Sequence, residues 1–308
     1  MKTIKIFLAA LVACSLAACS LQNEPSNGNG QGTDTSKVIK KSGKFSVSEN
    51  HKVVFSLGNL RYEAGEWSFA KEQYLYLGYD NDATDWTNAP HDLFAHGQTG
   101  YNLSALTDLT YKVPDVYAGY NQTSKKREQP AGTNWDWGIF CAITNGGYQA
   151  GLWRTLTMEE WNYLLTERKN ADKLKMPAMV AGKRGYLLLP DDYRNPGGVT
   201  APDPESSYVV GDNTYCYEDW KQMEEAGAVF LPCAGIYLIN TDGHTYYPEF
   251  CGYYWTMTNN LSTGAGQCAS YAVQFGYKQG GTQNLAISIQ NKVNCYDRCA
   301  VRLVQEAE

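Results

Sequence analysis

The sequence predicts an α+β fold in which short antiparallel strands outnumber helices. Tyrosine, tryptophan and glycine are abundant, with 23, 8 and 29 residues in a chain of 308. Aromatic side chains fill or line surfaces, and frequent glycines favour turns. Only two segments have the apolar spacing of amphipathic helices. We therefore expect short twisted antiparallel sheets, two main helices and extensive loops.

Residues 1–18 have the features of a secretory signal peptide. Lys2 and Lys5 precede the apolar run IFLAALVACSLAA, which is too short to span a bilayer as a permanent helix. The small residues LAA come directly before Cys19. This arrangement resembles the bacterial lipobox, whose cysteine is diacylated and becomes the mature N-terminus. The alternative is an ordinary cleavage site beside a coincidental cysteine. We expect cleavage before Cys19 and a membrane anchor on that residue.

Residues 19–43 are expected to form the lipidated cysteine and a flexible tether. The stretch SLQNEPSNGNGQGTDTS has almost nothing apolar to bury, so it cannot offset its own ordering entropy. Ser20 after the lipidated cysteine fits sorting to the outer membrane, and the tether fits exposure on the cell surface. Loss of the two signal lysines moves the formal net charge from −6 to −8. This negative charge disfavours nucleic acid as a partner.

Residues 44–308 contain no second linker and are expected to form one body. Strands and loops should occupy residues 44–130, and the core of the fold residues 131–308. KFSVS and KVVFS alternate apolar and polar residues as half-buried strands do, and LRYEAGEWSFA continues as a hairpin. Residues 79–129 have little periodicity. We expect them to pack as irregular structure.

The clearest helix lies in TLTMEEWNYLLTER. Thr157 and Glu160 have the spacing of a capping box, and Trp161 belongs to one apolar face. Arg168 suits the C-terminus of this helix, where cations are favourable.

A second, shorter helix is expected in YEDWKQMEEAG. Trp220 and Met223 should face inward, and Gly227 can end the helix. The strands expected after it are AVFLP, GYYWTMT, SYAVQFGY, LAISIQ and CAVRLV.

Several of these segments resemble a known family. WRTLTMEEWNYLLTER is similar to the WRLPTEAEWEY segment of formylglycine-generating-enzyme-like domains, and YLLLPDD, GAVFLPCAG, GYYWTMT and CAVRLV follow in the family's order. KFSVS, KVVFSLGNLRYE, WSFA, DLF, WG and AITNGG resemble gut Bacteroidetes lipoproteins with the major-paralogous form of this domain. The resemblance covers most of the mature chain and implies a C-type-lectin-like fold. It places Trp153, Trp161 and Trp255 in the core.

The cysteines do not match the chemistry of the related oxidising enzymes. Those enzymes bind copper through two cysteines that are five residues apart and well upstream of the final strand. Here Cys295 and Cys299 are four apart and abut CAVRLV. A disulfide, or two surface or packed thiols, is the interpretation we prefer. We therefore expect no catalytic residues and no cofactor, with an oxidoreductase as the alternative. The remaining mature cysteines have no zinc-like spacing: Cys141, Cys216, Cys233, Cys251 and Cys268.

Metal sites are not expected either. Asp80, Asp82 and Asp85 are close in sequence, but the glycine and closing glutamate of a helical calcium loop are missing. A calcium site is the alternative to an acidic turn. His91 and His96 are five apart without a third ligand, so packing within a loop is preferred to a shared metal.

The last sixty residues carry the strongest signal for binding. Their surface-type positions are Thr, Asn, Ser, Gln and Tyr, a composition typical of antibody paratopes. In SYAVQFGY, alternation directs Tyr271 and Val273 to one face and Ser270 and Gln274 outward. The layout also resembles variable proteins of diversity-generating retroelements, in which the closing strands of a C-type-lectin-like domain vary.

We therefore expect a non-catalytic lipoprotein that binds a protein or a glycan through its C-terminal strands and loops. The alternatives are an oxidoreductase, an adhesin or assembly component, and ordinary polar turns without a ligand. The candidate contact residues are Asn259, Asn260, Ser270, Gln274, Asn284, Gln290, Asn291, Asn294 and Tyr296.

Overall fold

The computed structural model describes residues 42–83, 85, 88–101, 118–121, 123–206, 213–239, 243–262, 268–277 and 284–308. For residues 277, 284 and 285 the backbone alone is described. Contacts divide the chain into two units, Met1–Lys37 and Val38–Glu308. The expected signal peptide, the lipidated Cys19 and most of the tether lie outside the described residues.

The strands confirm the α+β class and its antiparallel bias. Among the described residues, every strand pair is antiparallel except the pair of β9 with β11. The first four-stranded sheet contains, in order, β1 (Phe45–Ser46), β2 (Lys52–Phe55), β19 (Leu303–Glu306) and β8 (Arg154–Thr155). The second contains β11 (Thr214–Tyr215), β9 (Lys175–Val180), β10 (Lys183–Leu188) and β12 (Val229–Pro232). The third contains β14 (His244–Tyr246), β13 (Ile236–Leu238), β18 (Arg298–Cys299) and β5 (Phe94–Ala95).

Three smaller sheets complete the strand framework of the described residues. The three-stranded sheet contains β15 (Cys251–Asn259), β16 (Ala269–Tyr277) and β17 (Asn284–Asn294). The two hairpins are β3 (Leu60–Glu63) with β4 (Glu66–Phe69), and β6 (Tyr120–Asn121) with β7 (Lys126–Arg127). The expected hairpin in LRYEAGEWSFA is therefore confirmed.

In the described part of the chain, helices are few and short. They are η1 (Gly78–Asp82), α2 (Trp137–Phe140), α3 (Met158–Asn162), the π-turn η3 (Tyr163–Glu167), η4 (Ala171–Lys173) and α4 (Tyr217–Glu225). Among the described residues, none of these helices has the length and apolar character needed to cross a bilayer.

Helix α3 begins with the expected capping box. The Thr157 hydroxyl accepts from the Glu160 N–H, and the Glu160 carboxylate accepts from the Thr157 N–H. The predicted single helix instead widens into the π-turn η3. Within that turn two adjacent leucines, Leu164 and Leu165, are both buried. The Arg168 guanidinium donates back to the Leu164 carbonyl at 2.8 Å, as expected for a C-terminal cation.

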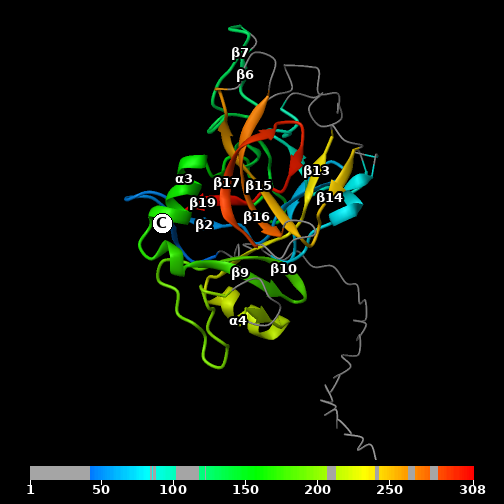
Figure 1. The fold of residues 1–308 in the computed structure, drawn as a ribbon. Helices are drawn as coiled ribbons and strands as arrows, with labels where there is room; N and C mark the ends of the chain where they lie inside the picture. The colour runs from blue at the N-terminus through cyan, green and yellow to red at the C-terminus, as the bar shows by residue number, and fades with distance from the viewer. Residues whose placement is uncertain are drawn as a thin grey trace, which may run out of the picture. The chain divides into compact units, whose positions relative to one another are not determined.

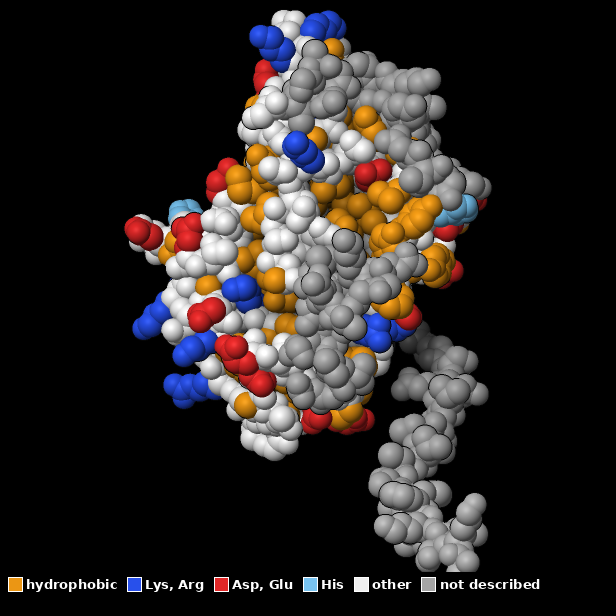
Figure 2. All heavy atoms as spheres, viewed as in Figure 1, with side chains coloured by type: hydrophobic (Ala, Val, Ile, Leu, Met, Phe, Trp, Pro, Cys, Tyr) orange, Lys and Arg blue, Asp and Glu red, His pale blue; other side chains and the backbone are white. Residues whose placement is uncertain are grey.

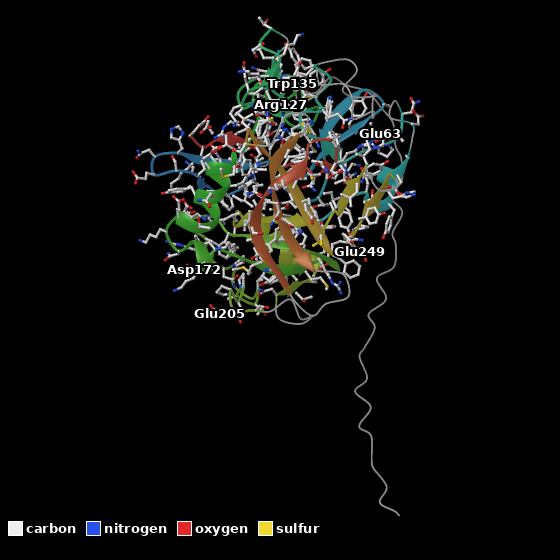
Figure 3. All side chains as sticks on the ribbon, turned by 45° about the horizontal axis from the view of Figure 1, so that its top comes forward. Glu63, Arg127, Trp135, Asp172, Glu205 and Glu249 are labelled. Atoms are coloured by element: carbon white, nitrogen blue, oxygen red, sulfur yellow. A yellow bond between two sulfur atoms is a disulfide. The ribbon has the colours of Figure 1, made fainter. Side chains whose placement is uncertain are left out.

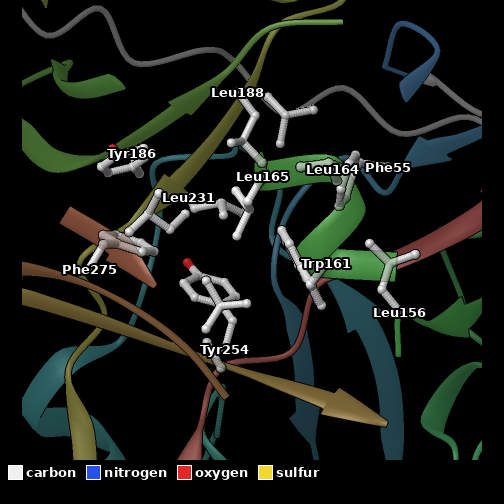
Figure 4. Close-up of a cluster of buried hydrophobic side chains, with 14 of the residues drawn as sticks. Phe55, Leu156, Trp161, Leu164, Leu165, Tyr186, Leu188, Leu231, Tyr254 and Phe275 are labelled. Carbon is white, nitrogen blue, oxygen red and sulfur yellow. The ribbon is translucent and has the colours of Figure 1, made fainter. Parts of the chain in front are cut away.

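The β15–β16–β17 sheet lies between two apolar clusters. Tyr254 and Val273 pack into the cluster that also contains Trp161 of α3. Trp255 and Ala272, on the opposite face, pack into a second cluster with Trp153 and Trp137. Figure 4 shows the first cluster, in which Trp161, Leu165 and Leu231 converge near Tyr254. Trp153, Trp161 and Trp255 are thus core residues, as predicted.

Helix α4 closes a third cluster, formed mainly with β9 and β10. Trp220 and Met223 are fully buried there, which confirms their predicted orientation. Gly227 follows with a φ of 95°, a left-handed conformation that favours glycine at a helix end. Figure 1 shows α4 beneath β9 and β10, with the β6–β7 hairpin at the opposite end of the described body.

Candidate functional site

Five of the predicted contact residues lie at one end of the β15–β16–β17 sheet. Asn259 pairs with Ser270 across β15 and β16, and Asn260 follows at the end of β15. The Asn260 amide donates to the backbone carbonyl of Asn291, and Asn294 pairs with Ala269. This end of the sheet lies next to the β6–β7 hairpin (Figure 1).

Asn259 is buried and makes internal hydrogen bonds with every polar atom of its side chain. Its amide donates to the carbonyls of Ala118 and Glu128, each at 2.7 Å. Its oxygen accepts from the Arg127 guanidinium and from the Ser270 hydroxyl. The side chain therefore anchors the segment around the β6–β7 hairpin to the sheet.

The prediction that Ser270 points outward is wrong. Ser270 is fully buried, because it lies on the same face of β16 as Ala272, opposite Val273, and the second apolar cluster and His96 cover that face. Its hydroxyl lies 3.1 Å from Nδ1 of His96. The Arg127 guanidinium donates to the same hydroxyl at 3.2 Å.

His96 completes this buried network as a neutral ring. Nε2 lies 2.8 Å from the carbonyl oxygen of Thr256, so it carries the proton and donates, and the unprotonated Nδ1 faces the Ser270 hydroxyl, whose single proton it shares with Oδ1 of Asn259. Burial, and secondarily the positive charge of Arg127, lowers the pKa of His96 to about 3. A serine and a histidine thus lie within hydrogen-bond distance here. Both are almost completely shielded from solvent, which fits a structural role.

Gly119 lets the hairpin segment approach the sheet. The Glu128 N–H donates to the Gly119 carbonyl at 2.8 Å. Gly119 has a φ of 76°, and a Cβ there would lie 2.0 Å from the Glu128 carbonyl oxygen. Only glycine fits this position without displacing the backbone opposite.

Beside this anchored hairpin the surface has a hollow of about 380 Å³, here called the hairpin hollow. Its described lining residues are Tyr101, Gly119, Tyr120, Asn121, Glu128, Gln129, Thr133, Asn134 and Trp135. Figure 3 shows Arg127 and Trp135 close together at this end, far from Asp172 and Glu205. Figure 2 shows basic side chains at the tip of the same end.

Aromatic contacts fix the apolar wall of the hairpin hollow. Tyr101 is 49% exposed and packs edge-on against Trp135 and Phe140, with ring centroids 5.5 and 5.6 Å apart. Thr99 connects Tyr101 to Asn134, because its hydroxyl donates to the Asn134 carbonyl and accepts from the Tyr101 N–H. The exposed ring of Tyr101 is thus held by neighbours on two sides.

Asp136 holds the turn that carries Trp135. Its fully buried carboxylate accepts from the Gly138 N–H, and from the N–H and hydroxyl of Thr155. Burial raises the pKa of Asp136 to about 6, although these hydrogen bonds favour the charged form. The turn is therefore tied to β8 in the interior.

The other predicted contact residues are spread along β16, β17 and the turn after β17. Gln274 lies four residues along β16 from Ser270, opposite Ser288, and its amide donates to the Tyr253 hydroxyl. Gln290 and Tyr296 are half-buried, and Asn291 is exposed. The side chain of Asn284 lies outside the described residues. The structure therefore does not gather all nine residues into one site.

The cysteine pair considered for copper chemistry is divided between two environments. Cys295 forms a disulfide with Cys268, which joins the end of β17 to the start of β16. Cys299 is fully buried, and burial raises the pKa of its thiol.

The acidic turn has structural partners. Asp82 accepts from the N–H and hydroxyl of Thr245, both at 2.7 Å, and lies 3.2 Å from Nδ1 of His244. Asp85 accepts from Asn88. Across the described part of the chain, no three His, Cys, Asp or Glu side chains gather as metal ligands would. His91 is fully buried, and its backbone pairs with Tyr62.

Sequence reasoning missed the hairpin hollow. Its aromatic residues lie within or just after the stretch that was expected to be irregular. Tyr101 and Trp135 lie among Gly, Asn and Thr without apolar periodicity, so no amphipathic element can bury them both. Aromatic residues in such a polar stretch were the sequence signal that could have indicated an exposed aromatic site.

No family model matches this sequence, and no match was found among curated proteins or solved structures.

Proposed function

We propose that this chain is an outer-membrane lipoprotein, anchored through Cys19 and exposed on the cell surface, that binds a protein or glycan without catalysis. The proposed fold is C-type-lectin-like, in line with the family resemblance of the closing strands and of the helix at Met158. In this proposal the tether carries the body away from the lipid, and the body binds the ligand.

The hairpin hollow is the observation that carries the binding proposal. It combines a half-exposed aromatic ring with amide, hydroxyl and carboxylate groups. Ligand pockets typically have such an apolar wall together with a small number of polar groups. Hydrogen bonds from Asn259 and Asp136 fix its two walls from the interior. Preorganised walls lower the entropy cost of binding.

Residues of the C-terminal strands hold the hairpin that lines this site. Asn259 and Ser270 hold the hairpin, whereas Asn291 is exposed at the same end of the sheet. If the chain is diversified by a retroelement, variation at Asn259 or Ser270 would break the anchor. Exposed positions such as Asn291 are then the ones expected to vary. A neighbouring reverse-transcriptase gene would support diversification, and neighbouring polysaccharide-utilisation genes would support glycan capture.

The oxidoreductase alternative has less support. It requires two thiols that can bind a metal together, and Cys295 is already bonded to Cys268. Cys299 belongs to β18 and is fully buried. The binding proposal requires neither thiol.

The proposal is tested on whole cells that express the full chain. Such cells should adhere to an immobilised mucin-type glycoprotein, to its deglycosylated core, or to both, more strongly than cells without the gene. Protease shaving should remove the chain and the adhesion together. A Cys19→Ala variant should lose the membrane anchor. Full protection from protease, or adhesion equal to that of cells without the gene, contradicts the proposal.

A further inference from the structure

We infer that the hairpin hollow binds one uncharged pyranose unit of a glycan, with Tyr101 as the stacking platform and Glu128 as the hydroxyl acceptor. This inference rests on the proposed binding function and names the ligand class of the same site.

The size of the hollow favours a sugar unit over a folded protein. Its volume of about 380 Å³ is near the lower end of the range of roughly 300–1,000 Å³ found for small-molecule sites. A stable protein interface instead buries about 800 Å² on each partner. One ring with its substituents fits the hollow, whereas a protein partner would use mainly the surface around it.

The aromatic wall suits the apolar face of a pyranose. Trp135 and Phe140 meet Tyr101 edge-on, at interplanar angles of 79° and 72°, so the orientation of the Tyr101 ring is fixed. The face of an aromatic ring carries partial negative charge. The C–H groups on one side of a pyranose carry partial positive charge and can pack against it.

The polar wall suits hydroxyl groups. The Asn121 amide donates to Oε1 of Glu128 at 2.8 Å, which fixes the plane of that carboxylate. Among the described residues, no hydrogen bond involves Oε2 of Glu128. A fixed carboxylate can accept from two neighbouring hydroxyls, and the amide of Asn134 can both donate and accept. Sugar hydroxyls need this mixture of acceptors and donors.

The charge of the hollow favours an uncharged sugar over an acidic one. Of its described lining residues, Glu128 alone is charged, and it would repel a uronate or sialate carboxylate. The guanidinium of Arg127 is directed inward, where it donates to Ala269 and Ser270. The basic side chains at the hairpin tip lie outside the lining (Figure 2).

The test uses the full lipidated chain in detergent micelles and three immobilised probes. These are neutral oligosaccharides ending in glucose, galactose, mannose or N-acetylglucosamine, sialylated or uronate-containing glycans, and a deglycosylated glycoprotein core. We expect saturable binding to at least one neutral oligosaccharide. Tyr101→Ala should weaken it by about tenfold or more, the equivalent of roughly 1.4 kcal/mol, and Glu128→Gln should weaken it by a similar factor.

Two control variants separate stacking from general damage. Tyr101→Phe keeps the ring and should retain the affinity within about threefold. Tyr79→Ala removes a tyrosine that is 66% exposed and outside the hollow, so the affinity should not change. Thermal unfolding of each variant should match that of the parent chain.

The remaining outcomes each decide the question. Preference for acidic glycans, or neutral binding that survives both Tyr101→Ala and Glu128→Gln, overturns the inference. Binding to the deglycosylated core alone also overturns it, while the proposed function stands. If the chain binds none of the probes and the whole-cell adhesion test also fails, both the inference and the proposed function are overturned.

Discussion

Asn259 and Gln129 are joined by a reciprocal pair of hydrogen bonds. The Asn259 N–H donates to Oε1 of Gln129 at 2.8 Å, and Nε2 of Gln129 donates to the Asn259 carbonyl at 3.1 Å. The Gln129 side chain thus satisfies the backbone of the last residue of β15, as a neighbouring strand would. Residues 130 positions apart in sequence are thus joined, and Gln129 also lines the hairpin hollow.

Replacement of Asn259 by alanine should therefore destabilise the body. The substitution leaves the carbonyls of Ala118 and Glu128 without their donor and removes an acceptor from Arg127. Each unsatisfied buried group costs about 1–3 kcal/mol, so we expect a loss of about 3 kcal/mol in the free energy of unfolding. Urea titration followed by tryptophan fluorescence measures it.

The matched control is Asn291→Ala at the same end of the sheet. Asn291 is exposed, and its backbone carbonyl, which accepts from Asn260, survives the substitution. The expected change is within about 0.5 kcal/mol. Equal losses in the two variants would show that Asn259 is not an anchor.

The failure to predict this anchor from sequence has a physical reason. Asparagine and serine near a strand end look like solvent-facing residues, because their partners lie far away in the chain. Arg127 is 143 residues from Ser270. Alternation also assigns Ser270 correctly to the face opposite Val273, but it cannot tell that both faces of this sheet are covered by apolar clusters.

Local signals performed better. The capping box at Thr157 and the apolar spacing around Trp220 depend on neighbours within a few residues, and both helices begin close to where they were expected. The continuation after Asn162 was wrong, since a π-turn replaces the last helical turn. Periodicity predicts which face of a helix is buried but not such a widening.

The disulfide between Cys268 and Cys295 should stabilise the fold by lowering the conformational entropy of the unfolded chain. It closes a loop with a sequence separation of 27 residues, for which chain entropy gives about 3–4 kcal/mol. We expect reductant to lower the midpoint of thermal unfolding of the parent chain. The Cys268→Ala/Cys295→Ala variant should start from the lower midpoint and not respond to reductant. A reductant response that persists in this variant would assign the effect to another cysteine.

Alanine at Gly119 should displace the β6–β7 hairpin. The new Cβ would meet the Glu128 carbonyl oxygen at 2.0 Å and Nδ2 of Asn259 at 2.8 Å, and the φ of 76° adds strain. We expect a loss of more than about 2 kcal/mol in the free energy of unfolding and weaker ligand binding in the hollow.

Gly132→Ala is the control for Gly119→Ala. Gly132 has a similar φ of 73°, but a Cβ there would meet nothing within 4 Å. The Gly132→Ala substitution should lower the free energy of unfolding by about 1–2 kcal/mol through backbone strain alone, and should leave ligand binding unchanged. Hydrogen exchange at residues 118–129 distinguishes the two variants. Identical exchange would mean that close approach at Gly119 does not position the hairpin.

The buried His96 should make stability depend on pH in a defined direction. Its pKa in the folded chain, about 3, is below the ordinary value of 6.5, so the unfolded chain binds the extra proton between these values. The associated stability is complete above pH 6.5 and is lost as the pH falls toward 3. Asp136 and Asp297 act oppositely between about pH 4 and pH 6, because burial raises the pKa of each to about 6.

Comparison with His96→Gln isolates the histidine from these carboxylates. The glutamine amide can still donate to the Thr256 carbonyl but does not titrate, whereas Asp136 and Asp297 contribute equally to both chains. The parent chain should be the more stable at pH 7. Its advantage should shrink by about 2 kcal/mol between pH 6.5 and pH 5, because each pH unit over which the two states differ by one proton changes stability by about 1.36 kcal/mol. Urea titrations at each pH measure the difference. An advantage that stays constant across this range would mean that His96 is not held neutral by burial beside Arg127.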